Sequence, residues 1–461
     1  MIFKDIRNIP LSQLTAIFLF FTALLLFFID HRWTDGKIIE WDIWSYYAYL
    51  PVTFLEQDWS MSFMNDHPEY VQNRYWPVQA PNGNWVIKTS MGMAIIYLPY
   101  FIIAHLWALV HSGMDANGFS EPYQIMIGLS GSVSLFIGLL NLRNFLKSYF
   151  SEIAIAFTFI FIVFGTNALH YTYNEGAMSH IHNFMLFSIF MRLTQLWHEN
   201  PNWKYTILIS LLSGLIALVR PNNALIGLFF IFYNVYSIES IKTKFKLFWN
   251  SRFKLVILPF LALSVWIPQL LYWKYTSGSW FFHSYIGERF FFDRPRFTLA
   301  LFSYTKGWFV YTPLAIIGLI GLFLIPKKSE ALKYVAPSFI LFNMYVVFSW
   351  WCWWYGGGYS QRALIDSYPI LAIGFASFFT LLFNSKILKF VFTVPLLLLL
   401  SLSLFQTWQY SIKLIHWDAT TKELYWTVFL KTKHPANYET MLRSVNMDDA
   451  KRGKVKYWGD K

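Results

Sequence analysis

The segment 38–51, IIEWDIWSYYAYLP, places two carboxylates among aromatic side chains shortly after a long apolar run. Glu40 and Asp42 lie two residues apart, and Trp44 and Tyr46 follow them. A carboxylate at a membrane edge can act as a general base, because partial burial raises its pKa. It can also bind a metal ion or accept a hydrogen bond from a sugar hydroxyl that the rings contact. The same pattern is typical of a solvated acid within an interfacial aromatic belt.

A lysine in the segment 85–101, WVIKTSMGMAIIYLPYF, could bind phosphate. Lys88 comes just before a glycine-containing apolar stretch, where free backbone amides at a helix start favour anions. The alternative is a lysine whose stem covers apolar surface while its ammonium group reaches water. The spacing alone does not separate these two interpretations.

The segment 165–184, GTNALHYTYNEGAMSHIHNF, contributes a second acid and histidines. Glu175 and His180 could complete a metal site with Asp42, and the ligand types favour a divalent ion such as Mg, Mn, Ca or Zn. His180 and His182 would diverge on a helix, so both cannot bind one ion. His180 could instead contact the sugar or acceptor. The other interpretation of this segment is a polar turn.

Positive charge and further aromatic residues come from three later segments. Arg220 precedes Pro221, Arg289 lies in the loop 277–300, and Arg362 follows a tryptophan-rich run that includes Trp354. Arginine binds phosphate oxygens in a bidentate manner, and tryptophan faces can stack on sugars. The alternatives are a helix-end arginine that reaches the interface and an aromatic belt. Convergence of five segments favours a site.

The composition indicates a membrane protein, so membrane helices must position these residues. The 461 residues are 56% hydrophobic, 21% aromatic and only 13% charged, against about 25% charged residues in soluble domains. This balance excludes a soluble enzyme, a disordered chain and a nucleic-acid partner. The net charge of +12 fits basic cytoplasmic loops. The single cysteine, Cys352, excludes an internal disulfide and a cysteine-based zinc site.

Apolar runs predict the membrane spans. The first is 11–29, which no cleavage site follows, and others lie near 91–111, 123–142, 151–168, 181–197, 205–221, 223–237, 255–274, 308–325, 335–350, 367–384 and 390–408. If the basic loops are cytoplasmic, residues 30–122, with four basic and ten acidic residues, form a large first outer loop. Runs 91–111 and 43–55 then lie in the interface as juxtamembrane helices. We expect an all-α polytopic membrane protein with about eleven transmembrane helices, a cytoplasmic N-terminus and an outer C-terminus. The alternative is a twelfth span at 91–111.

Residues 1–410, the predicted transmembrane domain, resemble the GT-C superfamily of membrane glycosyltransferases, notably the dolichyl-phosphate-mannose and aminoarabinose transferase type. The motifs are EWDIWSYYAYLP, KTSMG, YNEGAMSH, the arginine after GLIALV, and GGGYSQRALID. The resemblance implies that Asp42, or else Glu40, is the catalytic base or a ligand of the acceptor or metal, and that Glu175 assists. It also implies that Lys88 contacts the lipid phosphate. The chain departs from the family in having Glu-Trp-Asp in place of adjacent acids and KTSMG in place of a Lys-Pro pair.

These observations predict an inverting glycosyltransferase that moves a sugar from a polyprenyl-phosphate donor to an acceptor hydroxyl at the outer face of a bacterial plasma (inner) membrane. Lys88, Arg220, Arg289 and Arg362 would bind the donor phosphate, and the acceptor would be a glycan, a lipid or a protein. The sequence has no GxGxxG or Walker pattern, and this absence argues against a nucleotide-sugar donor. One alternative is a transporter or flippase of lipid-linked glycans, which would place charged residues inside the spans. The other is a non-catalytic scaffold, in which the charged residues would not converge. Residues 411–461 would form a short outer tail.

Overall fold

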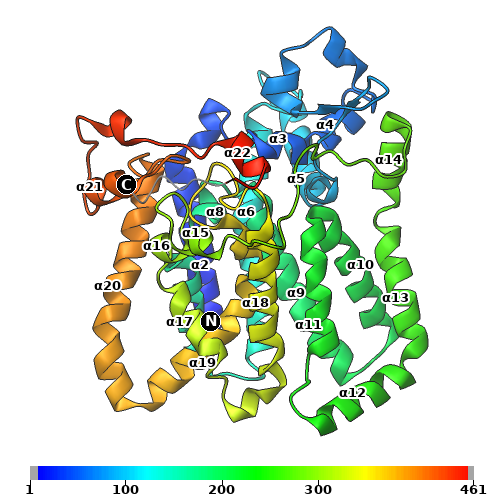
Figure 1. Cartoon of the computed structure of the whole chain (residues 1–461). Coiled ribbons are helices and arrows are strands. Elements are labelled where there is room, and N and C mark those ends of the chain that lie inside the picture. Colours follow the sequence, from blue (N-terminus) through cyan, green and yellow to red (C-terminus); the bar gives the residue numbers. More distant parts are fainter. Residues whose placement is uncertain (1–8, 455–461) are drawn as a thin grey trace.

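The computed structural model describes residues 9–454, which fold almost wholly as helices (Figure 1). Lys4 and Arg7, which flank the expected cytoplasmic N-terminus, lie outside the described residues, as do residues 455–461 of the predicted tail. Within residues 9–454 the only strands are β1 (Val78–Gln79) and β2 (Trp85–Val86). They pair antiparallel. The predicted all-α class is confirmed.

The helices follow one another along the whole described chain. The α-helices are α2 (Leu11–Asp30), α3 (Asp42–Tyr47), α4 (Tyr49–Phe54), α5 (Gly92–Val110), α6 (Glu121–Leu146), α7 (Glu152–Phe164), α8 (His170–Tyr173), α9 (Ser179–Glu199), α10 (Trp203–Val219), α11 (Gly227–Phe232), α12 (Ile238–Asn250), α13 (Arg252–Ser264), α14 (Ile267–Ser277), α15 (Phe297–Phe302), α16 (Trp308–Tyr311), α17 (Ala315–Leu322), α18 (Val335–Ser349), α19 (Tyr368–Asn384), α20 (Lys386–Ser411), α21 (Lys422–Val428) and α22 (Met447–Lys451). Shorter helical turns are η1 (Arg32–Asp35), η2 (Ser62–Asn65), η3 (Val71–Tyr75), η4 (Pro221–Ile226), η5 (Lys327–Leu332), η6 (Arg362–Ser367) and η7 (Tyr438–Met441).

Several helices are suited to a lipid environment. In the described part of the chain, six are long and apolar enough to cross a membrane, or seven if the bent pair α12 and α13 is one span. The six are Leu11–Asp30, Gly92–Val110, Glu121–Leu146, Lys327–Ser349, Arg362–Asn384 and Lys386–Ser411. Shorter apolar helices occupy Glu152–Phe164, Trp203–Val219 and Pro221–Phe232. Because a helix satisfies its own backbone hydrogen bonds, such segments are stable in lipid. The chain is thus an all-α membrane protein, and the total of eleven spans stays a prediction.

Helix α19 occupies the core of the bundle, and most of its residues are buried. Glycines let it approach α17 closely. A Cβ atom at Gly374 would lie 1.9 Å from the carbonyl oxygen of Gly318, and one at Gly321 would lie 1.9 Å from that of Gly374. Small residues allow helices to pack backbone against backbone in membranes, where van der Waals contact drives association.

Helix α5 runs across one end of the bundle. This end, at the top of Figure 1, is where α2 ends, α6 begins and α10 ends; we call it the upper end and the opposite one the lower end. The contacts of α5 in chain order are Gly92 with the backbone of Val219, Tyr97 with the carbonyl of Ala177, and His105 with the hydroxyl of Tyr123. All three partners lie at the upper end, so α5 crosses this end and packs against the start of α6.

Two side chains tie the segment before α3 to the bundle. The Gln124 Oε1 atom on α6 accepts hydrogen bonds from the backbone N–H groups of Ile38 and Ile39, at 3.0 and 2.9 Å. The Arg32 guanidinium donates to the backbone and side-chain oxygens of Asn174, at 2.5 and 3.0 Å. These contacts fix where Asp42, the first residue of α3, meets the segments around α8 and α9.

Candidate functional site

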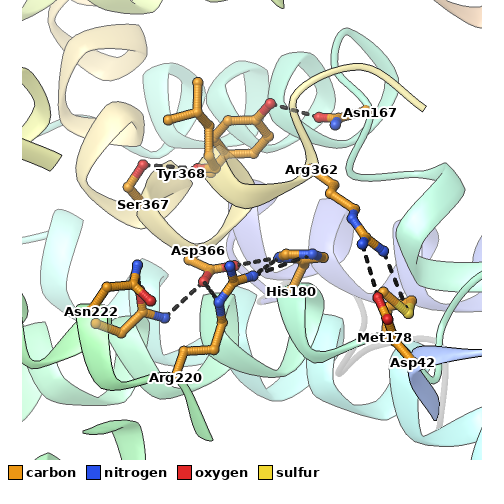
Figure 2. A network of polar contacts seen from close by, with 12 residues as sticks. Asp42, Asn167, Met178, His180, Arg220, Asn222, Arg362, Asp366, Ser367 and Tyr368 are labelled. Carbon is orange, nitrogen blue, oxygen red and sulfur yellow. Dashed lines mark hydrogen bonds and ion pairs between the residues drawn. The ribbon is translucent and has the colours of Figure 1, made fainter. Parts of the chain in front are cut away.

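An ion pair joins the first loop to the segment after the tryptophan-rich run. The Arg362 Nη2 atom donates to Asp42 Oδ2 at 2.8 Å, although 320 positions separate the two residues (Figure 2). The Arg362 side chain is 13% exposed and the Asp42 side chain 32%. Trp41, directly before Asp42, has φ 54°, a left-handed conformation that costs a non-glycine residue about 1–3 kcal/mol. The surrounding structure therefore holds Asp42 in a defined place.

A second polar cluster lies beside this pair (Figure 2). Asp366 is buried and accepts from Asn223 Nδ2 at 2.7 Å, and its Oδ1 lies 2.9 Å from His180 Nδ1. The Arg220 Nε atom lies 3.8 Å from Asp366 Oδ2. Because an ionised carboxylate only accepts hydrogen bonds, His180 donates from Nδ1 to Asp366. The Nε2 atom of His180 is then the acceptor of the ring, and it lies 3.4 Å from Arg220 Nη1. Arg220 also stacks on Tyr355, with its guanidinium carbon 5.6 Å from the ring centroid.

The Tyr46 phenol links the two clusters. Burial and the Asp42 carboxylate raise the pKa of Tyr46, while the charges of Arg220 and Arg362 lower it. The charges of Asp42, Arg220 and Arg362, which come from distant segments, thus all act on one phenol.

Glu175 lies in the turn before α9 and faces positive charge. Its Oε1 atom is 3.6 Å from His170 Nε2. Burial alone raises the pKa of Glu175, but His170, Arg32 and Arg362 lower it to about 2. Residues 9–454 contain no group of three or more His, Cys, Asp or Glu side chains placed to hold a metal ion. The divalent ion at Asp42 and Glu175 stays a prediction.

Lys88 reaches the same region but has an acidic partner. Its Nζ atom lies 3.5 Å from Glu288 Oε1 and 5.2 Å from the ring centroids of Trp76 and Tyr285. Trp351 Nε1 donates to the other Glu288 oxygen at 2.8 Å. The ammonium group is therefore held between a carboxylate and aromatic faces.

Four predicted residues have other surroundings. Arg289 is exposed and packs over Phe291, at 4.7 Å from its ring centroid. Trp44 packs against Trp41, and Trp354 is buried among other tryptophans. Burial raises the pKa of Glu40, and the charges of Arg32 and Lys37 lower it. None of these contacts joins the two clusters around Asp42 and Asp366.

Sequence reasoning gave no role to three buried polar residues of the site. Asp366 and Asn223 complete the second cluster, and Lys306 donates to the backbone carbonyls of Gly358 and Trp417. Burial lowers the pKa of Lys306 to about 7, although Asp418 opposes this shift. The available signals were the acid that ends the motif GGGYSQRALID, just before the apolar run 367–384, and a lysine just before the run 308–325. The motif drew attention to Arg362, and no motif surrounds Lys306.

Comparison with known proteins adds no relative. The chain matches no protein-family model, and no curated protein or solved structure is significantly similar to it.

Proposed function

We propose that the protein is a glycosyltransferase that moves a sugar from a polyprenyl-phosphate donor to an acceptor hydroxyl, with inversion. One observation carries the proposal: the carboxylate of Asp42 lies 2.8 Å from the guanidinium of Arg362, and Arg220 acts on the same phenol, Tyr46. Transfer from a phosphate donor needs this combination. A base must remove the acceptor proton, and cations must stabilise the departing phosphate.

In the proposed reaction, the donor phosphate takes the place of Asp42 on Arg362. A guanidinium binds phosphate oxygens as it binds a carboxylate, with paired N–H donors. Asp42 is then free to accept the proton of the acceptor hydroxyl. The hydroxyl oxygen forms a bond to the anomeric carbon as the bond from that carbon to the phosphate oxygen breaks. The phosphate leaves with the bonding electrons, and Arg362 stabilises its charge.

The remaining residues would have supporting roles. Asp366 and His180 position Arg220, so His180 is better placed to orient that arginine than to touch the acceptor. When the donor binds, its phosphate would replace Glu288 as the partner of Lys88. Tyr46 is available for sugar contact beside Asp42. The Glu175 carboxylate would balance the positive charge of His170 and Arg362.

The position of α5 supports the proposed topology. A helix that crosses the upper end suits a juxtamembrane helix of a large first loop, whereas a twelfth span would run along its neighbours. The two clusters would then face the outer side of a bacterial plasma membrane. The predicted eleven spans and the outer tail, 411–461, belong to the same proposal.

The test measures sugar transfer by the full chain in lipid vesicles, with a panel of radiolabelled polyprenyl-phosphate sugars and isolated cell-envelope acceptors. Asp42→Asn should lower turnover by roughly 10²–10⁴, the usual contribution of a general base. The control is Asp35→Asn, since Asp35 is exposed and pairs with Lys37. Near-normal transfer by Asp42→Asn would refute the assignment.

A separate measurement tests the donor site. Lys88→Ala should weaken binding of the donor lipid to the vesicles' protein while Lys37→Ala leaves it unchanged. Unchanged donor binding in Lys88→Ala would remove Lys88 from the site. Movement of intact donor between leaflets without transfer would instead favour the flippase.

A further inference from the structure

Helix α12 lies across the lower end of the bundle, below α10 and α11 (Figure 1). It meets α13 at a bend of 74°. Its first turn is fixed by a capping box, in which Ser237 and Ser240 each accept from the other's backbone N–H. The bend turns α12 away from the direction of α13, which continues upward into α14. Helix α12 is thus placed like a helix in the plane of a membrane interface.

A buried lysine holds one face of α12 against the protein. The Lys244 Nζ atom donates to the carbonyl oxygens of Phe230 and Tyr233, at 3.1 and 2.9 Å, and to His198 Nε2. An ammonium group only donates, so the His198 ring accepts at Nε2 and donates from Nδ1 to the Thr194 carbonyl, at 2.8 Å. This network ties α12 to α9 and α11, and it fixes which faces of α12 point outward.

The outward faces are apolar on one side and basic beside it. Ile238, Ile241, Phe245 and Trp249 are spaced three, four and four residues apart and form one stripe. Ile238, Phe245 and Trp249 are 76%, 70% and 61% exposed. Lys242 and Lys246 are exposed next to this stripe. Lys242 follows Ile238 by four residues and Lys246 follows Lys242 by four, so the two lysines lie on one side of the helix.

We propose that α12 lies in the membrane interface and binds the headgroups of anionic phospholipids. The apolar stripe enters the acyl region, and the lysines beside it lie at headgroup level. This is the arrangement by which basic amphipathic helices bind acidic bilayers. Arg252 and Lys254 at the start of α13 add to the positive charge, and Glu239 is the one acid within α12. The charge favours an anionic lipid over a zwitterionic one.

The test uses a fluorophore on α12 of the full chain in vesicles of phosphatidylcholine with a minor fraction of phosphatidylglycerol. In a Cys352→Ala background, Phe245→Cys carries the label. Nitroxides on the headgroups of one lipid or the other then quench it in proportion to their local concentration. Phosphatidylglycerol should quench several-fold more, because each lysine near an anionic surface favours that lipid by about fivefold. Equal quenching by both lipids would overturn the proposal.

Two charge-matched variants locate the effect. Lys242→Gln with Lys246→Gln should abolish the preference for phosphatidylglycerol. Lys386→Gln with Lys389→Gln removes the same charge from exposed positions at the start of α20, and it should leave the preference intact. Loss of the preference in both pairs would mean that net charge alone, and not α12, attracts the lipid.

A third label checks the orientation of α12. Thr243 is exposed on a different side of the helix from Phe245. A label at Thr243→Cys should be quenched less than the label at Phe245→Cys by nitroxides attached to the acyl chains. Equal or stronger quenching at position 243 would contradict the in-plane placement, even if α12 still attracted anionic lipid.

Discussion

Removal of the Asp366 carboxylate should destabilise the protein strongly. The Asp366 side chain is only 3% exposed, and the Arg220 side chain beside it is 16% exposed. Asp366→Ala removes the acceptor for Asn223 and His180 and leaves the Arg220 guanidinium without its carboxylate. Each hydrogen bond to a charged group contributes about 1.5–3 kcal/mol, and breaking a buried pair costs about 3–5 kcal/mol. Because the three contacts share one carboxylate, we expect the total to stay near 3–5 kcal/mol.

The assay is equilibrium unfolding of the full chain in mixed micelles. Asp366→Asn keeps the volume and an acceptor for Asn223, so it isolates the charge. The control is Asp293→Ala, since Asp293 pairs with Arg294 at the surface, with side chains 70% and 48% exposed; it should cost about 0–1 kcal/mol. Asp366→Asn combined with Arg220→Gln should cost less than the sum of the two, because both charges are then gone. If Asp366→Ala costs no more than Asp293→Ala, the cluster does not stabilise the fold.

Two further predictions concern the turn before α9 and the centre of the bundle. The pKa of Glu175 is about 2, below its ordinary value of 4.5, so its contribution to the free energy of unfolding is full above about pH 5 and is lost as the pH falls toward 2. Unfolding measured against pH should show this loss, and Glu175→Gln should reduce it; an unchanged pH dependence would contradict the charge assignment. Gly374→Ala should cost about 1–3 kcal/mol or more, because its Cβ would lie 1.9 Å from a carbonyl oxygen. Gly227→Ala, with open space around the added Cβ, should be neutral or slightly stabilising, and an equal loss in both variants would refute the packing argument.

The candidate site was only partly predictable from the sequence. Asp42, Arg220 and Arg362 each stand out because ionised groups beside apolar runs are costly and therefore informative. Arg289 has the same local signature but is exposed over Phe291. The sequence cannot tell these cases apart, because side-chain burial depends on which distant segments pack together.

The partners of the charged groups were equally hidden. Lys88 was predicted to bind phosphate, and it has Glu288 as its neighbour at 3.5 Å. Asp366, which the sequence places at the start of an apolar run, contacts His180 and Asn223. The partners are 143 and 186 positions apart in the sequence, so no local sequence pattern marks these contacts.

The sequence by itself determined that this protein lies in a membrane and that it is helical. With 13% charged residues, the chain cannot cover itself with polar groups, and its long apolar runs predict membrane-spanning helices. Only the tertiary structure decided which charges meet and that α5 crosses the upper end. Hydropathy depends on each segment alone, but an ion pair such as Asp42 with Arg362 exists only once segments 320 positions apart are packed together.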